Sequence, residues 1–155
     1  MTGSNCPRRY SRLVAKNGRE ILTTLPEGSR KLIAPVTYRD ASDDYRRNFL
    51  NAMNVVHRDE VALDDRMVKM LDSQTLWDST MAFSIFESLK TCEIIFHLSG
   101  YFHVQNDLGI VEHLRRLDED VECRSVVILP DENPHFDETN RNLADWIVVT
   151  DINRE

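Results

Sequence analysis

The chain has 155 residues, of which 41% are hydrophobic and 29% charged, as is ordinary for one globular domain. Its formal net charge of −7 argues against nucleic acid as a partner, because duplex binding depends on Lys and Arg side chains that neutralise phosphates. No apolar run reaches the roughly 18 residues that span a bilayer, and residues 1–10 lack the apolar core of a signal peptide. The sequence as written therefore predicts a cytoplasmic protein.

The first forty residues predict one short helix and a connector. Within residues 8–22, apolar positions precede the stop signal Asn17-Gly18, so a helix is expected to end there. Residues 25–41 contain two prolines and a glycine, and they predict a connector with one helical turn at 28–33.

Two amphipathic helices are expected next. Ser42 is a suitable N-cap for the first, and two aspartates follow it in the first turn, where negative charge complements the helix dipole. Apolar side chains then recur at intervals of four, four and three residues, at Tyr45, Phe49, Met53 and Val56. The second helix is predicted from about Asp64 to Leu89.

Two polar residues interrupt the apolar stripe of this second helix. Gln74 lies four residues after Met70. Asp78 stands beside Trp77 and four residues before Ala82. An unpaired polar group on a buried face is costly, so the two require either local hydrogen bonds or a polar site beneath the helix. In the second case Asp78 would orient a histidine or a metal-bound water.

The chain changes character after this helix. Bulky apolar residues at 93–98 predict a buried strand, which Ser99-Gly100 ends. After a loop at 101–106, Asp107 is expected to cap a helix. The apolar face of that helix consists of Ile110, Val111, Leu114 and Leu117.

Two more strands are predicted near the end of the sequence. Residues 125–129 form the first, which Pro130 stops, and residues 146–149 form the second after a polar loop at 131–142. The order strand, helix, strand over 93–129 implies two parallel strands joined by a right-handed crossover.

These elements predict an α/β fold in which N-terminal helices precede a strand–helix–strand unit of a mostly parallel sheet. We expect a single domain with four parts: a helix and connector in 1–41, two helices in 42–90, the strand–helix–strand unit in 91–130, and a loop and final strand in 131–155. Parallel strands normally have cover on both faces, so three strands among so many helices indicate a partial domain. Its open sheet edge would favour a homo-oligomer.

His103 is the strongest candidate for a functional residue. It follows a predicted strand, and ligands of open α/β sheets gather outside the carboxyl ends of strands. Gly100 would let the backbone turn sharply beside it. The alternative is a histidine that caps the loop or the next helix. His97 is expected to be a buried neutral histidine or, alternatively, a group that orients His103 or a ligand.

The other histidines and the cysteines are expected to have no functional role. Polar loops or an exposed helix face are predicted for His57, His113 and His135. Cys6, Cys92 and Cys123 form no CxxC pair, so the sequence predicts neither a metal knuckle nor a disulfide framework. We expect Cys92 and Cys123 to be small buried residues.

Several segments carry a combination of motifs. Residues 74–82 read Q-x-x-W-D-x-x-M-A, and residues 97–103 followed by 108–114 contain G-x-x-H and then G-I-x-x-x-L. Residues 5–10 read N-x-P-x-R-Y, and residues 42–46 look like the start of the helix that follows it. Together these segments resemble the ChaN-like haem-uptake family of the ChaN/Tiki superfamily.

The resemblance implies an α/β fold with a largely parallel sheet. Some members of the family are outer-membrane lipoproteins that bind haem in iron uptake, so it implies haem or an iron source as the partner and an exported location. It also implies that His103 belongs to the second of two histidine motifs, with Gln74 and Asp78 on the helix behind it. The first motif, of the type Gly-Glu-x-His, would precede the first residue given, which suggests a truncated chain.

Three functions follow from the resemblance. A haem-binding module would need an axial ligand. The candidates are His103, His97, Tyr101, Tyr10 and Tyr38. A metal-dependent hydrolase of the Tiki type would instead need Asp78 and His103 to share a divalent metal with a third ligand such as His97. A truncated interaction fragment would lack both activities. We expect haem binding, without catalysis.

Overall fold

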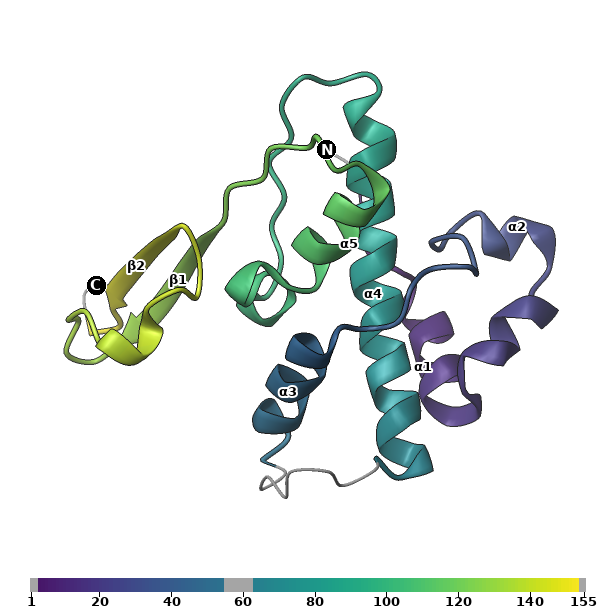
Figure 1. The fold of residues 1–155 in the computed structure, drawn as a ribbon, viewed down its shortest axis with the longest axis horizontal. Helices are drawn as coiled ribbons and strands as arrows, with labels where there is room; N and C mark the ends of the chain where they lie inside the picture. The colour runs from purple at the N-terminus through teal and green to yellow at the C-terminus, as the bar shows by residue number, and fades with distance from the viewer. Residues whose placement is uncertain (1–2, 55–62, 154–155) are drawn as a thin grey trace.

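In the computed structural model of this chain, residues 3–54 and 63–153 are described. Helices come first along the chain and a small sheet comes last (Figure 1). The main elements are α1 (Arg8–Asn17), α2 (Glu27–Arg30), α3 (Asp43–Ala52), α4 (Asp65–Leu89), α5 (Ile110–Leu117), β1 (Val126–Asp131) and β2 (Trp146–Asp151). Short 3-10 turns are η1 (Arg19–Thr24), η2 (Tyr101–His103), η3 (Gln105–Asp107) and η4 (Glu138–Asn140). The predicted class, helices followed by a parallel sheet, is confirmed.

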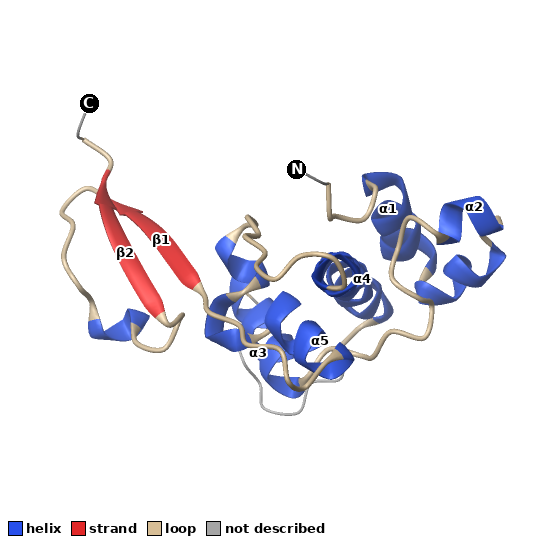
Figure 2. Ribbon diagram, turned by 90° about the horizontal axis from the view of Figure 1, so that it is seen from above, coloured by secondary structure: helices blue, strands red, loops and turns tan. Residues whose placement is uncertain are grey.

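Helix α4 is the central element of the helical body. Its first turn is capped by Asp64, whose carboxylate accepts a hydrogen bond from the backbone N–H of Met67 at 2.7 Å. Viewed from above, α1 lies on one side of α4 and α5 on the other (Figure 2). One apolar cluster forms between α1 and α4 around Val14, Leu22 and Leu76. A second forms between α4 and α5 around Met81, Ile85, Ile110 and Leu114.

The predicted helix ends agree in part with the structure. Helix α1 ends at Asn17, and Gly18 takes the positive φ of 82° that glycine adopts without strain. Ser42 caps α3 and accepts a hydrogen bond from the N–H of Tyr45 at 3.2 Å. Helix α3 ends at Ala52, however, so Met53, predicted on its apolar stripe, is 42% exposed. Val56 and His57 lie outside the described residues.

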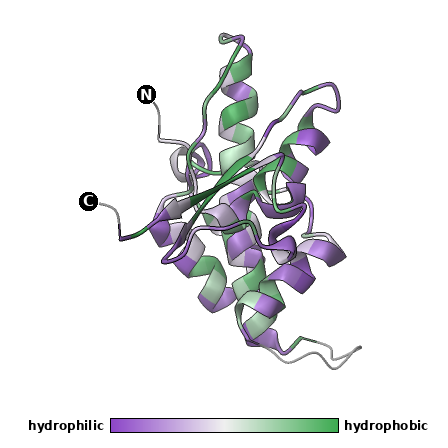
Figure 3. Ribbon diagram, turned by 90° about the vertical axis from the view of Figure 1, so that its left-hand side faces the viewer, coloured by the Kyte–Doolittle hydropathy of each residue, from purple (hydrophilic) through white to green (hydrophobic). Residues whose placement is uncertain are grey.

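Strands β1 and β2 pair directly with each other in parallel. Their register runs from Val126 opposite Trp146 to Asp131 opposite Asp151. Residues 132–145 make the crossover and contain the turn η4 in place of an α-helix. The pair projects away from the helical body (Figure 2), and its face with Val126, Ile128, Trp146 and Val148 is exposed (Figure 3), whereas parallel sheets usually have cover on both faces.

The predicted strand at 93–98 is wrong. This segment is extended but belongs to no sheet, and Ile94, Phe96 and Leu98 are 76%, 95% and 93% exposed. The physical reason is that a strand needs a neighbour, and in the described part of the chain no backbone–backbone hydrogen bond reaches residues 94–99. The parallel pair therefore forms between the two later strands, and the unit predicted over 93–129 does not form.

The start of α5 also differs from the prediction. Gly109 stands at the N-cap, while the carboxylate of Asp107 pairs with Arg115 at 2.9 Å. Leu117, predicted on the apolar face, is 42% exposed because the helix ends there. His113, predicted to face solvent, is only 6% exposed. Packing by the connector before α3 buries it, since Ala34, Pro35 and Tyr38 lie beside it.

The three cysteines are free, as the sequence predicts. Cys6 is buried. Cys123 is half-buried against the cluster between α4 and α5, but Cys92 is exposed, which contradicts the expectation for it. Cys92 is exposed because the chain leaves α4 there without meeting another element. Within the described residues, no helix combines the length and the apolar composition that a membrane crossing requires.

Candidate functional site around Asp78 and His103

His103 lies in the loop that joins the extended segment to α5. Its backbone N–H donates to the carbonyl of Gly100 at 3.0 Å, which closes the turn η2. Gly100 has a φ of −63°, a value open to any residue, so the backbone freedom expected of it is not used. A Cβ at Gly100 would lie 3.8 Å from Cδ2 of His103, which is an ordinary contact, so the position does not require a glycine for space either.

Asp78 holds the opposite side of the His103 ring. Its Oδ1 lies 2.5 Å from Nδ1 of His103, and Asp78 is 0% exposed in the middle of α4. A carboxylate in this position accepts the Nδ1 proton and thereby keeps Nε2 unprotonated when the ring is neutral. Within the described residues, Nε2 of His103 has no hydrogen-bond partner and is free to bind a ligand.

The second oxygen of Asp78 has an unusual environment. Oδ2 of Asp78 and Oη of Tyr45 are both buried, and neither forms a hydrogen bond within the described part of the chain. The two groups are close enough that burial and the charge of Asp78 together raise the pKa of Tyr45, which therefore stays protonated. Burial also raises the pKa of Asp78, while its hydrogen bond to His103 lowers it.

Aromatic rings fix the orientation of the imidazole. Trp77 and Phe102 contact the His103 ring at centroid distances of 6.2 and 5.9 Å, both nearly perpendicular to it. Tyr45 in turn contacts Phe102 at 5.5 Å. These contacts come from α3, α4 and the loop, and they leave the His103 side chain 17% exposed. The imidazole is thus held by packing as well as by its hydrogen bond.

Gly109 allows α5 to begin against this pair. Its φ is +57°, which side-chain-bearing residues rarely adopt. A Cβ there would lie 2.4 Å from the backbone oxygen of His103 and 3.1 Å from Oδ2 of Asp78. Any other residue at this position would push the loop and the helix apart.

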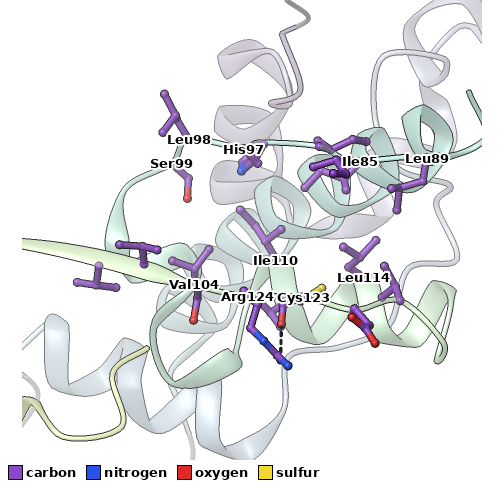
Figure 4. A pocket seen from close by; sticks show the side chains of 18 of the residues that line it. Ile85, Leu89, His97, Leu98, Ser99, Val104, Ile110, Leu114, Cys123 and Arg124 are labelled. Carbon is purple, nitrogen blue, oxygen red and sulfur yellow. Dashed lines mark hydrogen bonds between the residues drawn. The ribbon is translucent and has the colours of Figure 1, made fainter. Parts of the chain in front are cut away.

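A groove of about 550 Å³, lined mainly by apolar residues, lies near this loop, although His103 itself is not one of its lining residues. Its walls include His97, Tyr101 and Val104, which are close neighbours of His103 in the chain. Figure 4 shows Leu98, His97, Ile85 and Leu89 in one row, facing Val104, Ile110, Cys123 and Leu114. The volume falls within the range of about 300–1,000 Å³ found for pockets that bind small molecules and cofactors.

His97 lies near His103 on the wall of this groove. Its Nε2 is 2.8 Å from Oγ of Ser4, and the ring is half-buried. Burial lowers the pKa of His97, and the neighbouring His103 lowers it further. His97 is therefore a neutral imidazole beside the groove at physiological pH.

The remaining predicted ligands divide between the groove and the other cluster. Tyr101 is 53% exposed on the groove rim. Tyr10 is 4% exposed in the cluster between α1 and α4, where its hydroxyl accepts a hydrogen bond from Arg9, and Tyr38 packs against the same cluster. Gln74 is half-buried on α4 and, among the described residues, bonds to neither member of the pair. In residues 3–54 and 63–153, no three His, Cys, Asp or Glu side chains converge as a metal site would require.

Four residues around the pair were not predicted from the sequence to belong to the site, and one of them is Trp77, which was expected only as part of a buried helix face. Tyr45 was expected only on the apolar stripe of its helix, and Phe102 and Gly109 only within motifs. The burial of Tyr45 was therefore predictable, but its neighbour was not, because α3 and α4 approach each other only in the folded chain. Gly109 alone carried a local indication, a glycine directly before an apolar helix.

Comparison with known proteins agrees with the resemblance seen in the motifs. The family described as "Haem-binding uptake, Tiki superfamily, ChaN" matches residues 1–114, which include Asp78, His103 and the aromatic residues around them but not the part of the groove formed by residues 121–128. No curated protein and no solved structure matched significantly. The family match covers well over half of the 155 residues. The chain thus belongs to the ChaN family of haem-binding uptake proteins in the Tiki superfamily.

Proposed function

We propose that this protein binds haem in the apolar groove, with Nε2 of His103 as the axial ligand of the iron. One observation carries the proposal: the buried carboxylate of Asp78 holds Nδ1 of His103 at 2.5 Å, and Tyr101 and Val104, on either side of His103 in the chain, line a groove of about 550 Å³. A histidine that ligates a metal almost always donates its other N–H to a carboxylate, carbonyl or water, which fixes the ring and increases its basicity.

The groove suits a flat, largely apolar macrocycle with charged edges. Aliphatic side chains from α4, the extended segment and α5 form most of its walls. Among the described lining residues, Arg124 is the one arginine or lysine, and its side chain is 65% exposed. Arg124 could pair with a haem propionate at the mouth of the groove, since a guanidinium binds carboxylates with two hydrogen bonds.

His97 is an alternative residue that would hold the iron from the wall of the groove. His97 is neutral and half-buried, so its imidazole can bind iron once it exchanges its hydrogen bond with Ser4. Tyr101 is the alternative on the rim. Haem, when bound, would supply the iron centre, and the protein residues would supply its ligand, a largely apolar enclosure and one arginine for a propionate.

The hydrolase alternative has weaker support from the geometry. It requires Asp78 and His103 to share one metal ion, whereas Oδ1 of Asp78 is bonded to Nδ1 of His103 itself. In this arrangement Asp78 orients His103. A carboxylate commonly does this for a histidine that binds a metal, by accepting the N–H of its other ring nitrogen.

Titration of haemin into the purified chain, followed by absorbance in the Soret region, tests the proposal. We expect a saturable transition for the native chain. His103→Ala should bind at least about tenfold more weakly or show a shifted Soret maximum, because the axial nitrogen is lost.

His135→Ala is the matched control. His135 is an exposed loop histidine whose Nδ1 contacts the backbone oxygen of Asn133, so its removal should leave the titration unchanged. If His103→Ala and the native chain gave the same affinity and the same spectrum, His103 would not be the ligand and the proposal would be wrong.

A further inference from the structure

A second, smaller pocket lies where the connector between α2 and α3 crosses α4 beside α5 (Figure 1). Its volume is about 180 Å³, and it shares no lining residue with the groove. Most of its wall is apolar, and the basic residues in that wall are Arg39, His113 and Arg116. This pocket is therefore separate from the site of the proposed function.

Hydrogen bonds hold the connector in place over this pocket. At one end, the backbone N–H of Ala34 donates to Oγ1 of Thr80 on α4 at 3.0 Å. At the other end, the guanidinium of Arg116 on α5 donates to the backbone carbonyl of Asp40 at 3.0 Å. The connector is thus tied to both helices, so the pocket is formed before any ligand arrives, as small-molecule sites usually are.

The imidazole of His113 lies in the wall of this pocket without a hydrogen-bond partner. The residue is 6% exposed, and within the described residues its ring forms no hydrogen bond. The ring nitrogens are not among the fully buried atoms that lack a partner, so each keeps a small accessible surface. A polar group that is buried without a partner costs free energy. An acceptor in the pocket would therefore gain a hydrogen bond that the folded chain leaves unmade.

The charge around His113 is positive although the chain as a whole is acidic. The chain has 26 Asp and Glu against 19 Lys and Arg, yet the described lining of this pocket contains two arginines and no acidic residue. Arg116 pairs with Glu112, whereas Arg39 forms no ion pair within the described residues. Burial lowers the pKa of His113 to about 4, and the charges of Arg116 and Arg19 lower it further, so the ring is neutral. A free guanidinium near a neutral N–H donor attracts an anion.

We propose that this pocket binds a small aromatic monocarboxylate, whose carboxylate pairs with Arg39 and accepts a hydrogen bond from the imidazole of His113. A guanidinium binds a carboxylate with two parallel hydrogen bonds. The ring of the acid would pack against Phe83 of α4 and Pro35 of the connector, which supply apolar wall. A volume of about 180 Å³ is smaller than the pockets that hold drug-sized molecules, so it suits an acid of on the order of ten non-hydrogen atoms.

Titration of benzoate into the haem-free chain, followed through the imidazole signals of His113 by NMR, tests this site. We expect a saturable shift with a dissociation constant of about 0.1–1 mM, as suits so small a ligand. Benzamide has the same shape without the charge, so it should bind at least about tenfold more weakly. The bound carboxylate favours the protonated imidazole, so the pKa of His113 should rise from about 4 in the complex.

Arg39→Gln should weaken the binding of benzoate by about five- to tenfold, because the guanidinium that pairs with the carboxylate is lost. Arg66→Gln is the matched control. Arg66 is also exposed and forms no ion pair within the described part of the chain, but it lies roughly 20 Å before Ser79 along α4. Both variants alter exposed side chains, and circular dichroism would verify that each stays folded.

Three outcomes would overturn the proposal. The first is a His113 signal that benzoate does not shift at concentrations well above the millimolar range. The second is equal binding of benzoate and benzamide, since the pocket would then recognise the ring and not the charge. The third is equal affinity of Arg39→Gln and Arg66→Gln for benzoate. Haem takes no part in these measurements, so their outcome is separate from that of the haemin titration.

Discussion

At the scale of single residues, the site depends on the close approach of the Asp78 carboxylate, His103 and the backbone of Gly109. Asp78 reaches His103 only because α5 begins at a residue without a side chain, Gly109. The motif showed that Asp78 interrupts an apolar stripe, which predicted either local bonds or a polar site. The structure shows a hydrogen bond from a distant loop, which the stripe could not reveal because the partner lies 25 residues away.

Gly109→Ala should destabilise the chain by about 2 kcal/mol or more, because the added Cβ meets the His103 carbonyl at 2.4 Å and the backbone φ is +57°. Urea unfolding measures the change in free energy. Gly28→Ala is the control, since nothing lies within 4 Å of a Cβ there and Gly28 is helical. A Gly109→Ala variant as stable as the control would show that the close approach carries no strain.

Asp78→Asn should separate the binding role of the pair from its structural role. The variant removes a buried charge, so we expect its stability to be equal or higher, while haem affinity falls by about 10- to 100-fold as His103 loses its anionic acceptor. Urea unfolding and the Soret titration give the two readings. Loss of stability in parallel with affinity would indicate that Asp78 serves mainly to hold the fold.

At the scale of elements, helix ends and helix faces were predicted better than the sheet. Asp64, Ser42 and Asn17-Gly18 act locally, so their caps and stops could be identified from the sequence. The burial of His113 could not be identified from the sequence, because the residues that cover it belong to the connector at 33–41. A residue on the flank of an amphipathic helix is buried or exposed according to what packs beside it.

His113 should make stability depend on pH. Burial lowers its pKa from the ordinary 6.5 to about 4, so the unfolded chain takes up a proton before the folded chain does. Stability is therefore complete above pH 6.5 and is lost as the pH falls toward 4, by about 3 kcal/mol at most. Urea unfolding between pH 4.5 and 7 measures the slope.

His113→Gln should flatten this slope, and His135→Gln, on an exposed loop, should not. Asp78 contributes in the opposite direction, because its raised pKa makes stability fall as the pH rises. All three proteins retain Asp78, so the difference between their profiles isolates His113. Identical slopes for His113→Gln and the native chain would show that His113 is not buried as a neutral group.

At the scale of the whole molecule, the helical body has a core of its own while the sheet and the extended segment do not. Two clusters enclose α4, whereas one face of β1 and β2 and the outward side of residues 93–99 are left uncovered. Local opening requires little free energy where backbone groups have no partners. The groove lies between the well-packed and the uncovered parts, so its shape depends on both.

Hydrogen exchange should show this division directly. In dilute solution, the amides of residues 94–99 should exchange at least about a thousandfold faster than those in the middle of α4, which are hydrogen-bonded and packed on two sides. Protection of 94–99 in dilute solution would mean that another part of this chain pairs with the segment.

The sequence by itself determined the main helices, the two later strands, the free cysteines and the family. These features rest on local periodicity, caps and motifs, which act over a few residues of the chain. Only the tertiary structure decided that residues 93–98 find no strand partner, that His113 is buried, that Gly109 allows the helix to begin against the pair, and that Tyr10 lies away from the groove. Each of these features depends on which distant segment of the chain packs against the residue concerned, and neither hydropathy nor motif spacing indicates that segment.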